Sequence, residues 1–190
     1  MRQNNSLAQA LDQFMQAVLD TLNVSAAHPQ NMFMIADDEQ WQSPCIQTDA
    51  DDNGEVAWIP VLQPFPAEFD NVEDAVQFSL HPDIKTFYSR YFSDPLYACS
   101  PRGNLQLLQV WNEDDVERLQ ANLIGHILMK QKLRQPITLF FALTDEEDFI
   151  LTIDNDSGEV LLEQVGREAQ EVLAADLATF IASLKPQLLD

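Results

Sequence analysis

The segment Asp49-Ala50-Asp51-Asp52-Asn53-Gly54 carries oxygen side chains at a spacing that could bind calcium. Asp49, Asp51 and Asn53 fit the first half of an EF-hand loop, and Gly54 stands where that loop turns sharply. The twelfth position, which should supply a bidentate Glu, is Pro60, and the flanking residues resemble strands rather than helices. We therefore interpret the segment as an acidic hairpin turn and predict no metal site.

The other residues that could take part in catalysis or metal binding lack the partner residues that such sites need. His28, His81 and His126 are scattered without the spacing of a zinc site, and we expect His126 to be a satisfied or solvated residue on the flank of a helix. The acidic run 145–148 is typical of a solvated turn between strands, because a carboxylate pair working as acid and base needs a cleft. With five glycines the chain has no phosphate-binding loop, and no nucleophile elbow occurs. We predict no catalytic residue and no cofactor. An enzyme remains the least favoured of the functions considered below.

Charge limits the class of partner. The 190 residues hold 31 acidic and 10 basic side chains, a net charge of -21, and no lysine or arginine occurs between Arg2 and Lys85. Such a chain repels phosphate backbones and anionic lipid and attracts Lys/Arg-rich proteins. We therefore expect no nucleic-acid binding and no direct insertion into lipid.

Compartment follows from the apolar pattern and the cysteines. No apolar run approaches the roughly 18 residues of a membrane span, and the first 22 residues lack the continuous apolar stretch of a signal peptide. Cys45 and Cys99 form no C-x-x-C pair, which favours reduced, buried thiols over the alternative of a single disulfide. The sequence predicts a soluble cytosolic protein.

The first half of the chain shows one helical pattern followed by a hairpin. Apolar residues recur at helical spacing up to Leu22 and predict a leading helix over about residues 6–22. A polar loop is expected over 23–42. Segments 45–48 and 56–62 predict two short strands joined by a type I′ turn at Asn53-Gly54, with Pro60 limiting the second strand.

Two further helices are expected before residue 92. Asn71 could cap a helix over 72–80, and Pro82 stands near the start of a helix over 83–91. A strand is predicted over 105–111.

The strongest helical signal follows at 113–134. Asn112 fits an N-cap, acidic residues occupy the first turn and basic residues the last, as the helix dipole favours. Gly125 inside this helix costs about 1 kcal/mol relative to Ala, which predicts close packing of another element. The expected buried stripe consists of Val116, Leu119, Leu123, Ile124, Ile127 and Leu128.

The last third adds a buried strand over 137–143, a hairpin of 149–153 with 160–165, and a final helix over 175–184. Because hairpins and helices alternate irregularly, we predict an α+β fold, with a mostly antiparallel sheet packed against helices. The chain length favours one domain over residues 1–190.

A specific set of short motifs occurs from residue 43 onward, in a fixed order. They are Ser43-Pro44-Cys45-Ile46, Thr86-Phe87-Tyr88, Leu107-Leu108-Gln109-x-Trp111, Glu113-Asp114-Asp115, Gln120-x-Asn122-Leu123-Ile124-Gly125-His126, Ser157-Gly158-Glu159-Val160 and Leu184-Lys185-Pro186. This combination closely resembles the Syd family of SecY-interacting proteins over residues 43–189, while the first 40 residues match only as a leading helix.

The resemblance implies a SUKH-like α+β fold and a protein without catalytic residues or cofactors. It also implies a cytoplasmic protein that binds peripherally on the cytoplasmic side of the inner membrane. The partner would be SecY, the channel subunit of the Sec translocase, whose basic cytoplasmic loops would meet an acidic concave face. Binding would sequester uncomplexed SecY or restrain translocation. SUKH domains also include immunity proteins, so neutralisation of a basic toxin is the alternative.

Residues for such a contact are expected in the half of the chain without lysine or arginine. Glu113, Asp114 and Asp115 are weaker candidates, because their place at a helix start already accounts for them. The predicted partner-binding residues are Asp37, Asp38, Glu39, Asp49, Asp51, Asp52, Glu68, Asp70, Glu73 and Asp74.

Overall fold

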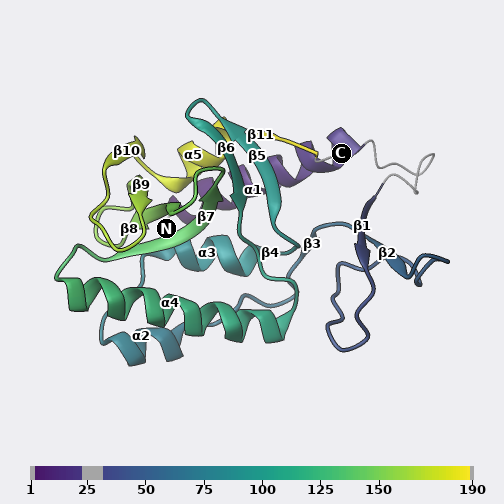
Figure 1. The fold of residues 1–190 in the computed structure, drawn as a ribbon, viewed down its shortest axis with the longest axis horizontal. Helices are drawn as coiled ribbons and strands as arrows, with labels where there is room; N and C mark the ends of the chain where they lie inside the picture. The colour runs from purple at the N-terminus through teal and green to yellow at the C-terminus, as the bar shows by residue number, and fades with distance from the viewer. Residues whose placement is uncertain (1–2, 23–31, 189–190) are drawn as a thin grey trace.

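The computed structural model of the chain describes residues 3–22 and 32–188 (Figure 1). The helices are α1 (Gln3–Leu22), α2 (Asp70–Val76), α3 (Pro82–Arg90), α4 (Glu113–Leu133) and α5 (Leu177–Ser183). The strands are β1 (Phe33–Ala36), β2 (Glu55–Trp58), β3 (Val61–Leu62), β4 (Tyr91–Phe92), β5 (Leu96–Ser100), β6 (Gly103–Leu107), β7 (Thr138–Thr144), β8 (Phe149–Asp154), β9 (Val160–Gln164), β10 (Glu171–Ala174) and β11 (Lys185–Pro186).

A curled seven-stranded sheet is the centre of the molecule. Its strand order is β10-β9-β8-β7-β6-β5-β11, and every neighbouring pair is antiparallel. Two small two-stranded sheets, β1-β2 and β3-β4, lie outside it. Helices and a mostly antiparallel sheet confirm the predicted α+β class.

Helices cover both faces of this sheet, as neighbouring residues of β7 show. Phe140 packs edge-on against His126 of α4, while Phe141 packs against Phe87 of α3 and Phe180 of α5. Successive strand residues point to opposite faces, so α4 covers one face and α3 and α5 the other. Helix α1 packs on α3 and α5, and α2 on α4 (Figure 1).

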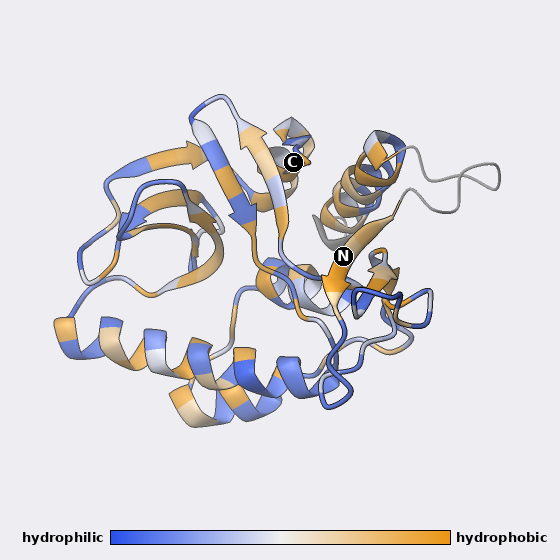
Figure 2. Cartoon of the chain, turned by 45° about the vertical axis from the view of Figure 1, so that its right-hand side comes forward, coloured by the Kyte–Doolittle hydropathy of each residue, from blue (hydrophilic) through white to orange (hydrophobic). Residues whose placement is uncertain are grey.

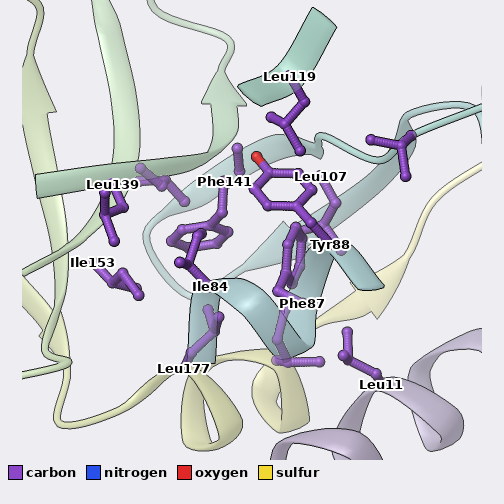
Figure 3. Packing of buried hydrophobic residues seen from close by; sticks show 14 of the residues in the cluster. Leu11, Ile84, Phe87, Tyr88, Leu107, Leu119, Leu139, Phe141, Ile153 and Leu177 are labelled. Atoms are coloured by element: carbon purple, nitrogen blue, oxygen red, sulfur yellow. The ribbon is translucent and has the colours of Figure 1, made fainter. Parts of the chain in front are cut away.

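Helix α3 connects the two layers through its buried aromatic side chains (Figure 3). Phe87 and Tyr88 have no exposed surface, and their rings meet edge-on at 4.9 Å. The Tyr88 ring lies near Leu107 and Leu119 (Figure 3), and Leu11 of α1 belongs to the same buried cluster. The Tyr88 hydroxyl donates to the Phe140 carbonyl at 3.0 Å. One helical turn thus anchors α1, α4 and the sheet to one core.

A buried ion pair crosses from α4 to the sheet. Lys130 Nζ lies 2.9 Å from Glu163 Oε1, and both side chains are fully buried. Thr138 and Thr152 donate to the second carboxylate oxygen, and Lys130 also donates to the Arg167 carbonyl. His126 borders this cluster through Thr138 Oγ1, and burial lowers the pKa of its imidazole. The expectation that His126 is satisfied on a helix flank is confirmed.

Most elements with strong local signals are confirmed. Helices α1, α3, α4 and α5 occur where the sequence predicts them, as do strand β7 and the β8–β9 hairpin. Asn112 caps α4, since its side chain accepts the Asp115 backbone N–H. Cys45 and Cys99 are free thiols, with Cys45 buried and Cys99 only partly so.

The first hairpin is predicted wrongly. Part of the expected loop 23–42 is strand β1, which pairs with β2, while residues 23–31 with His28 lie outside the described residues. Segment 45–48 makes only a single bridge, from Ile46 to Trp58. The turn is not type I′, because Gly54 has a φ of 76° but Asn53 has none of the required positive φ. The secondary structure of this region depends on the pairing of β1 with β2, which is distant in sequence.

Three other expectations fail. Helix α2 begins at Asp70 without a side-chain cap, so Asn71 lies inside the helix, where its Nδ2 donates to Gln120 Oε1 of α4. Leu128 is 50% exposed and does not belong to the buried stripe of α4. Strands β4, β5, β10 and β11 were not predicted, and the strand expected over 105–111 ends at Leu107.

Gly125 is the clearest correction, because nothing lies within 4 Å of the position of an added Cβ. Gly125→Ala should therefore stabilise the protein by about 1 kcal/mol by removing backbone freedom from the unfolded chain. The melting temperature should rise by about 2–4 °C.

Gly158→Ala is the opposite case, because Gly158 has a φ of +78° and its added Cβ would lie 2.7 Å from His81 Nε2. It should lower stability, and an unchanged melting temperature for both variants would contradict this interpretation.

Replacing Lys130 by Met should cost about 3–5 kcal/mol, because Glu163 would remain buried without a counter-charge. Lys132→Met, two residues along the same helix and exposed, should change stability by less than about 0.5 kcal/mol. Urea denaturation measures both. In the double variant Lys130→Met/Glu163→Leu most of the loss should be recovered; an equal loss for Lys132→Met would mean that burial of the pair is not the cause.

Candidate functional site

Two strands and their long connection form a separate acidic unit, which we call the β1–β2 unit (residues 33–58). Phe33 pairs with Trp58, and the connection folds back along the other edge of β2. There Gln47 N donates to the Ala57 carbonyl at 2.8 Å and Ile59 N to the Cys45 carbonyl at 3.2 Å. The connecting loops are hydrophilic (Figure 2).

Asp51 holds the turn before β2 in place. Its carboxylate accepts the backbone N–H groups of Asn53 at 2.8 Å and Glu55 at 3.0 Å. These hydrogen bonds lower the pKa of Asp51, the bond from Glu55 most of all. The carboxylate therefore stays charged, but its first task is local structure.

The two acidic loops of the unit meet in a hollow of about 410 Å³, which we call the acidic hollow. Its carboxylate-bearing residues are Asp37, Glu39 and Asp49, and it has no lysine or arginine in its lining. Its full lining is Asp37, Glu39, Gln42, Ile46, Thr48, Asp49, Ala50 and Val56. The unit thus presents negative charge in a concave surface, which suits a basic side chain or segment.

The β1–β2 unit is attached to the main body through three tryptophans, which we call the tryptophan junction (Trp41, Trp58 and Trp111). The rings of Trp58 and Trp111 meet edge-on at 5.4 Å. Trp111 Nε1 donates to the Trp41 carbonyl at 3.0 Å, and Asn112 Nδ2 donates to the Gln42 carbonyl at 2.8 Å. Because Asn112 also caps α4, the start of this helix fixes the acidic loops in space.

A second depression, the Gln109 cleft, lies against the same loop. It has a volume of about 310 Å³ and is lined by residues that include Trp41, Asp94, Gln109, Asp115 and Arg118. Burial raises the pKa of Asp94, and the negative charge of Asp115 raises it further. Asp94 lies outside the motifs that carry the resemblance, and Gln109 belongs to one of them, but no local pattern indicates that the two residues line one cleft.

The remaining predicted residues surround α2. Glu68, Asp70 and Asp74 are exposed, whereas Glu73 pairs with Lys85 at 2.6 Å, and that hydrogen bond lowers its pKa. Helix α2 lies beneath α4, away from the β1–β2 unit (Figure 1). The ten predicted residues therefore form two groups, namely Asp37, Asp38, Glu39, Asp49, Asp51 and Asp52 on the unit and the other four around α2.

The described part of the chain has neither a metal-binding cluster nor a helix suited to cross a membrane. Within residues 3–22 and 32–188, no group of three His, Cys, Asp or Glu side chains is placed to hold a metal ion. None of the helices in these ranges is long and apolar enough to cross a bilayer.

Comparison with known proteins gives one consistent family. The family model described as Syd protein (SUKH-2) matches residues 8–186. Protein Syd of Pseudoalteromonas atlantica is 51% identical over 155 residues, covering 80% of this chain and 83% of the relative. Protein Syd of Alteromonas mediterranea is 54% identical over 152 residues, 80% of this chain and 84% of the relative. Protein Syd of Shewanella frigidimarina is 40% identical over 185 residues, 96% of this chain and 84% of the relative.

The tryptophan junction gives a test of how the unit is held. Trp111→Phe keeps the edge-on ring but removes the donor to the Trp41 carbonyl, which should cost about 1 kcal/mol. Amide exchange in residues 33–58 should accelerate about fivefold, while exchange in β7–β9 stays unchanged. Tyr97→Phe, at an exposed site on β5, is the control. Uniform acceleration across the sheet would instead mean that the substitution weakens the whole fold.

Proposed function

The chain belongs to the Syd family, and from this premise we propose that it binds SecY through the β1–β2 unit. The acidic hollow receives basic cytoplasmic loops of SecY, and the contact is largely electrostatic. The observation that supports this most directly is the concave lining with Asp37, Glu39 and Asp49 and no cation. Cytoplasmic loops of membrane proteins are rich in Lys and Arg, so the charges are complementary.

The same charge keeps the protein peripheral to the bilayer. With a net charge of -21 the chain is repelled by the anionic cytoplasmic leaflet and by nucleic acid. Association with the inner membrane then depends on SecY alone, on its cytoplasmic side. In this proposal the protein has no catalytic step or cofactor and acts by occupying SecY, either sequestering uncomplexed SecY or restraining translocation.

The geometry divides the candidate residues of the unit into two roles. Asp37 accepts from Gln42 Nε2 and Asp51 holds the turn, so both maintain the shape of the loops. Glu39, Asp49 and Asp52 make no side-chain hydrogen bond or ion pair with residues that the structure describes. Their charges are free for a partner. The acids around α2 form a secondary contact at most, because they lie apart from the hollow.

Charge reversal of the free acids tests the proposal. The triple variant Glu39→Lys/Asp49→Lys/Asp52→Lys should bind SecY complexes in nanodiscs roughly tenfold more weakly at low salt. Its salt dependence should also flatten, because screening acts on the charges that were removed. Binding is measured at low and high salt by surface plasmon resonance.

The matched control is Asp145→Lys/Glu146→Lys/Glu147→Lys, which has the same change of charge on a turn that lines neither the hollow nor the cleft. It should retain most of the affinity. Equal loss in both variants would mean that net charge alone matters, and full binding by the first would remove the hollow from the interface. Absence of SecY binding by the folded wild type would overturn the proposal and favour a basic toxin as partner.

A further inference from the structure

The Gln109 cleft contains a buried polar group that has nothing to bind. Gln109 is 7% exposed, and neither its Nε2 nor its Oε1 has a hydrogen-bond partner. A primary amide carries two donors and an acceptor, and such groups are rarely left unpaired when buried. The side chain lines a cleft of about 310 Å³, which is at the lower end of the range, roughly 300–1,000 Å³, of small-ligand sites. An unpaired buried amide in a cleft of this size indicates a candidate site for a hydrogen-bonding ligand.

The two carboxylates in the cleft, those of Asp94 and Asp115, differ in whether they have hydrogen-bond partners within the protein. Asp115 is occupied, because its Oδ2 accepts the Trp111 backbone N–H at 2.9 Å and its Oδ1 pairs with Arg118 at 2.7 Å. The Asp94 carboxylate makes no side-chain hydrogen bond or ion pair with any residue the structure describes. Asp94 and Gln109 Oε1 therefore offer two free acceptors in one cleft.

One guanidinium, that of Arg118, is already bound in the lining of the cleft. Arg118 stacks over the Trp41 ring at 5.2 Å while pairing with Asp115. Tyr88, Trp111 and Phe140 supply further aromatic side chains to the lining of the cleft. Arginine suits such surroundings better than lysine, because its planar group stacks on rings and can donate to two acceptors at once.

We propose that the Gln109 cleft receives one arginine side chain of the bound partner, with its guanidinium donating to Asp94 and Gln109 Oε1. Gln109 Nε2 then donates to a peptide carbonyl of the same segment. This inference rests on the proposed function for the identity of the partner but not for the chemistry of the cleft. Trp41, in the cleft lining, belongs to the same loop as Asp37 and Glu39 of the acidic hollow, so one basic segment can contact both.

Short peptides test the cleft without SecY. The probes are acetyl-Gly-Arg-Gly-amide and its lysine and citrulline analogues, added to the full chain. Fluorescence reports binding because Trp41 and Trp111 line the cleft, and the Gln109 side-chain amide gives a second signal by ¹H–¹⁵N NMR. The arginine probe should bind saturably in about the millimolar range, several-fold tighter than lysine, whereas the uncharged citrulline probe should not saturate.

Three variants separate the cleft from general charge. Asp94→Asn should weaken the arginine probe about tenfold or more, whereas Glu147→Gln, an exposed acid elsewhere, should leave it unchanged. Gln109→Met should weaken binding but leave the melting temperature unchanged or higher, because the wild-type amide makes no internal hydrogen bond. A lowered melting temperature for Gln109→Met would indicate a structural amide and overturn the inference.

The SecY nanodisc assay keeps the two proposals distinguishable. Asp94→Asn should weaken SecY binding while Glu147→Gln does not. If the wild type fails to bind SecY but shows the expected peptide pattern, the proposed function fails and the cleft inference stands. If SecY binds while all three peptides behave alike and Asp94→Asn has no effect, the cleft inference is wrong and the proposed function survives.

Discussion

The contact between Trp58 and Trp111 is the constraint on which the candidate site depends. It joins a small two-stranded sheet to the start of α4, and the surrounding hydrogen bonds from Trp111 and Asn112 reach the backbone of the acidic loop. Two strands of four residues are marginal alone, so the unit needs this attachment. Its acids are therefore presented in a fixed arrangement, at a cost in binding entropy lower than that of a mobile acidic tail.

The positions of the lysines and arginines explain why the surface of the β1–β2 unit is negatively charged. Five basic residues of the described chain form ion pairs: Lys85, Arg90, Arg102, Arg118 and Lys130. Their exposure differs, since the pair of Arg102 with Glu171 is exposed and the pair of Lys130 with Glu163 is fully buried. Arg118 is the cation that lines the Gln109 cleft, and Asp115 already neutralises it. The acids of the β1–β2 unit consequently have little internal compensation. In the proposed function, a basic partner would compensate these negative charges.

Prediction from sequence succeeded where a local signal was sufficient. Asn112 with three acids behind it specifies the start of α4, and Pro82 specifies that of α3, because capping and dipole effects act within one turn. It failed where a distant partner decided the outcome. Residues 33–36 are a short apolar run in a segment expected to be a loop, and they form β1 by pairing with β2. Asn71, expected as a cap, lies inside α2 and donates to Gln120 of α4.

For this protein the sequence by itself determined the α+β class, the principal helices, the family and the sign of the charge, because periodicity, caps and composition are properties of neighbouring residues. Tertiary structure alone decided which acids share a surface. It brought Asp37 and Glu39 to Asp49 in one hollow, left the α2 acids elsewhere, and assigned Asp51 to holding a turn. It also placed Asp94 and the unpaired amide of Gln109 in one cleft. The physical reason is that burial and hydrogen-bond satisfaction depend on residues far apart in the chain, which no local pattern records.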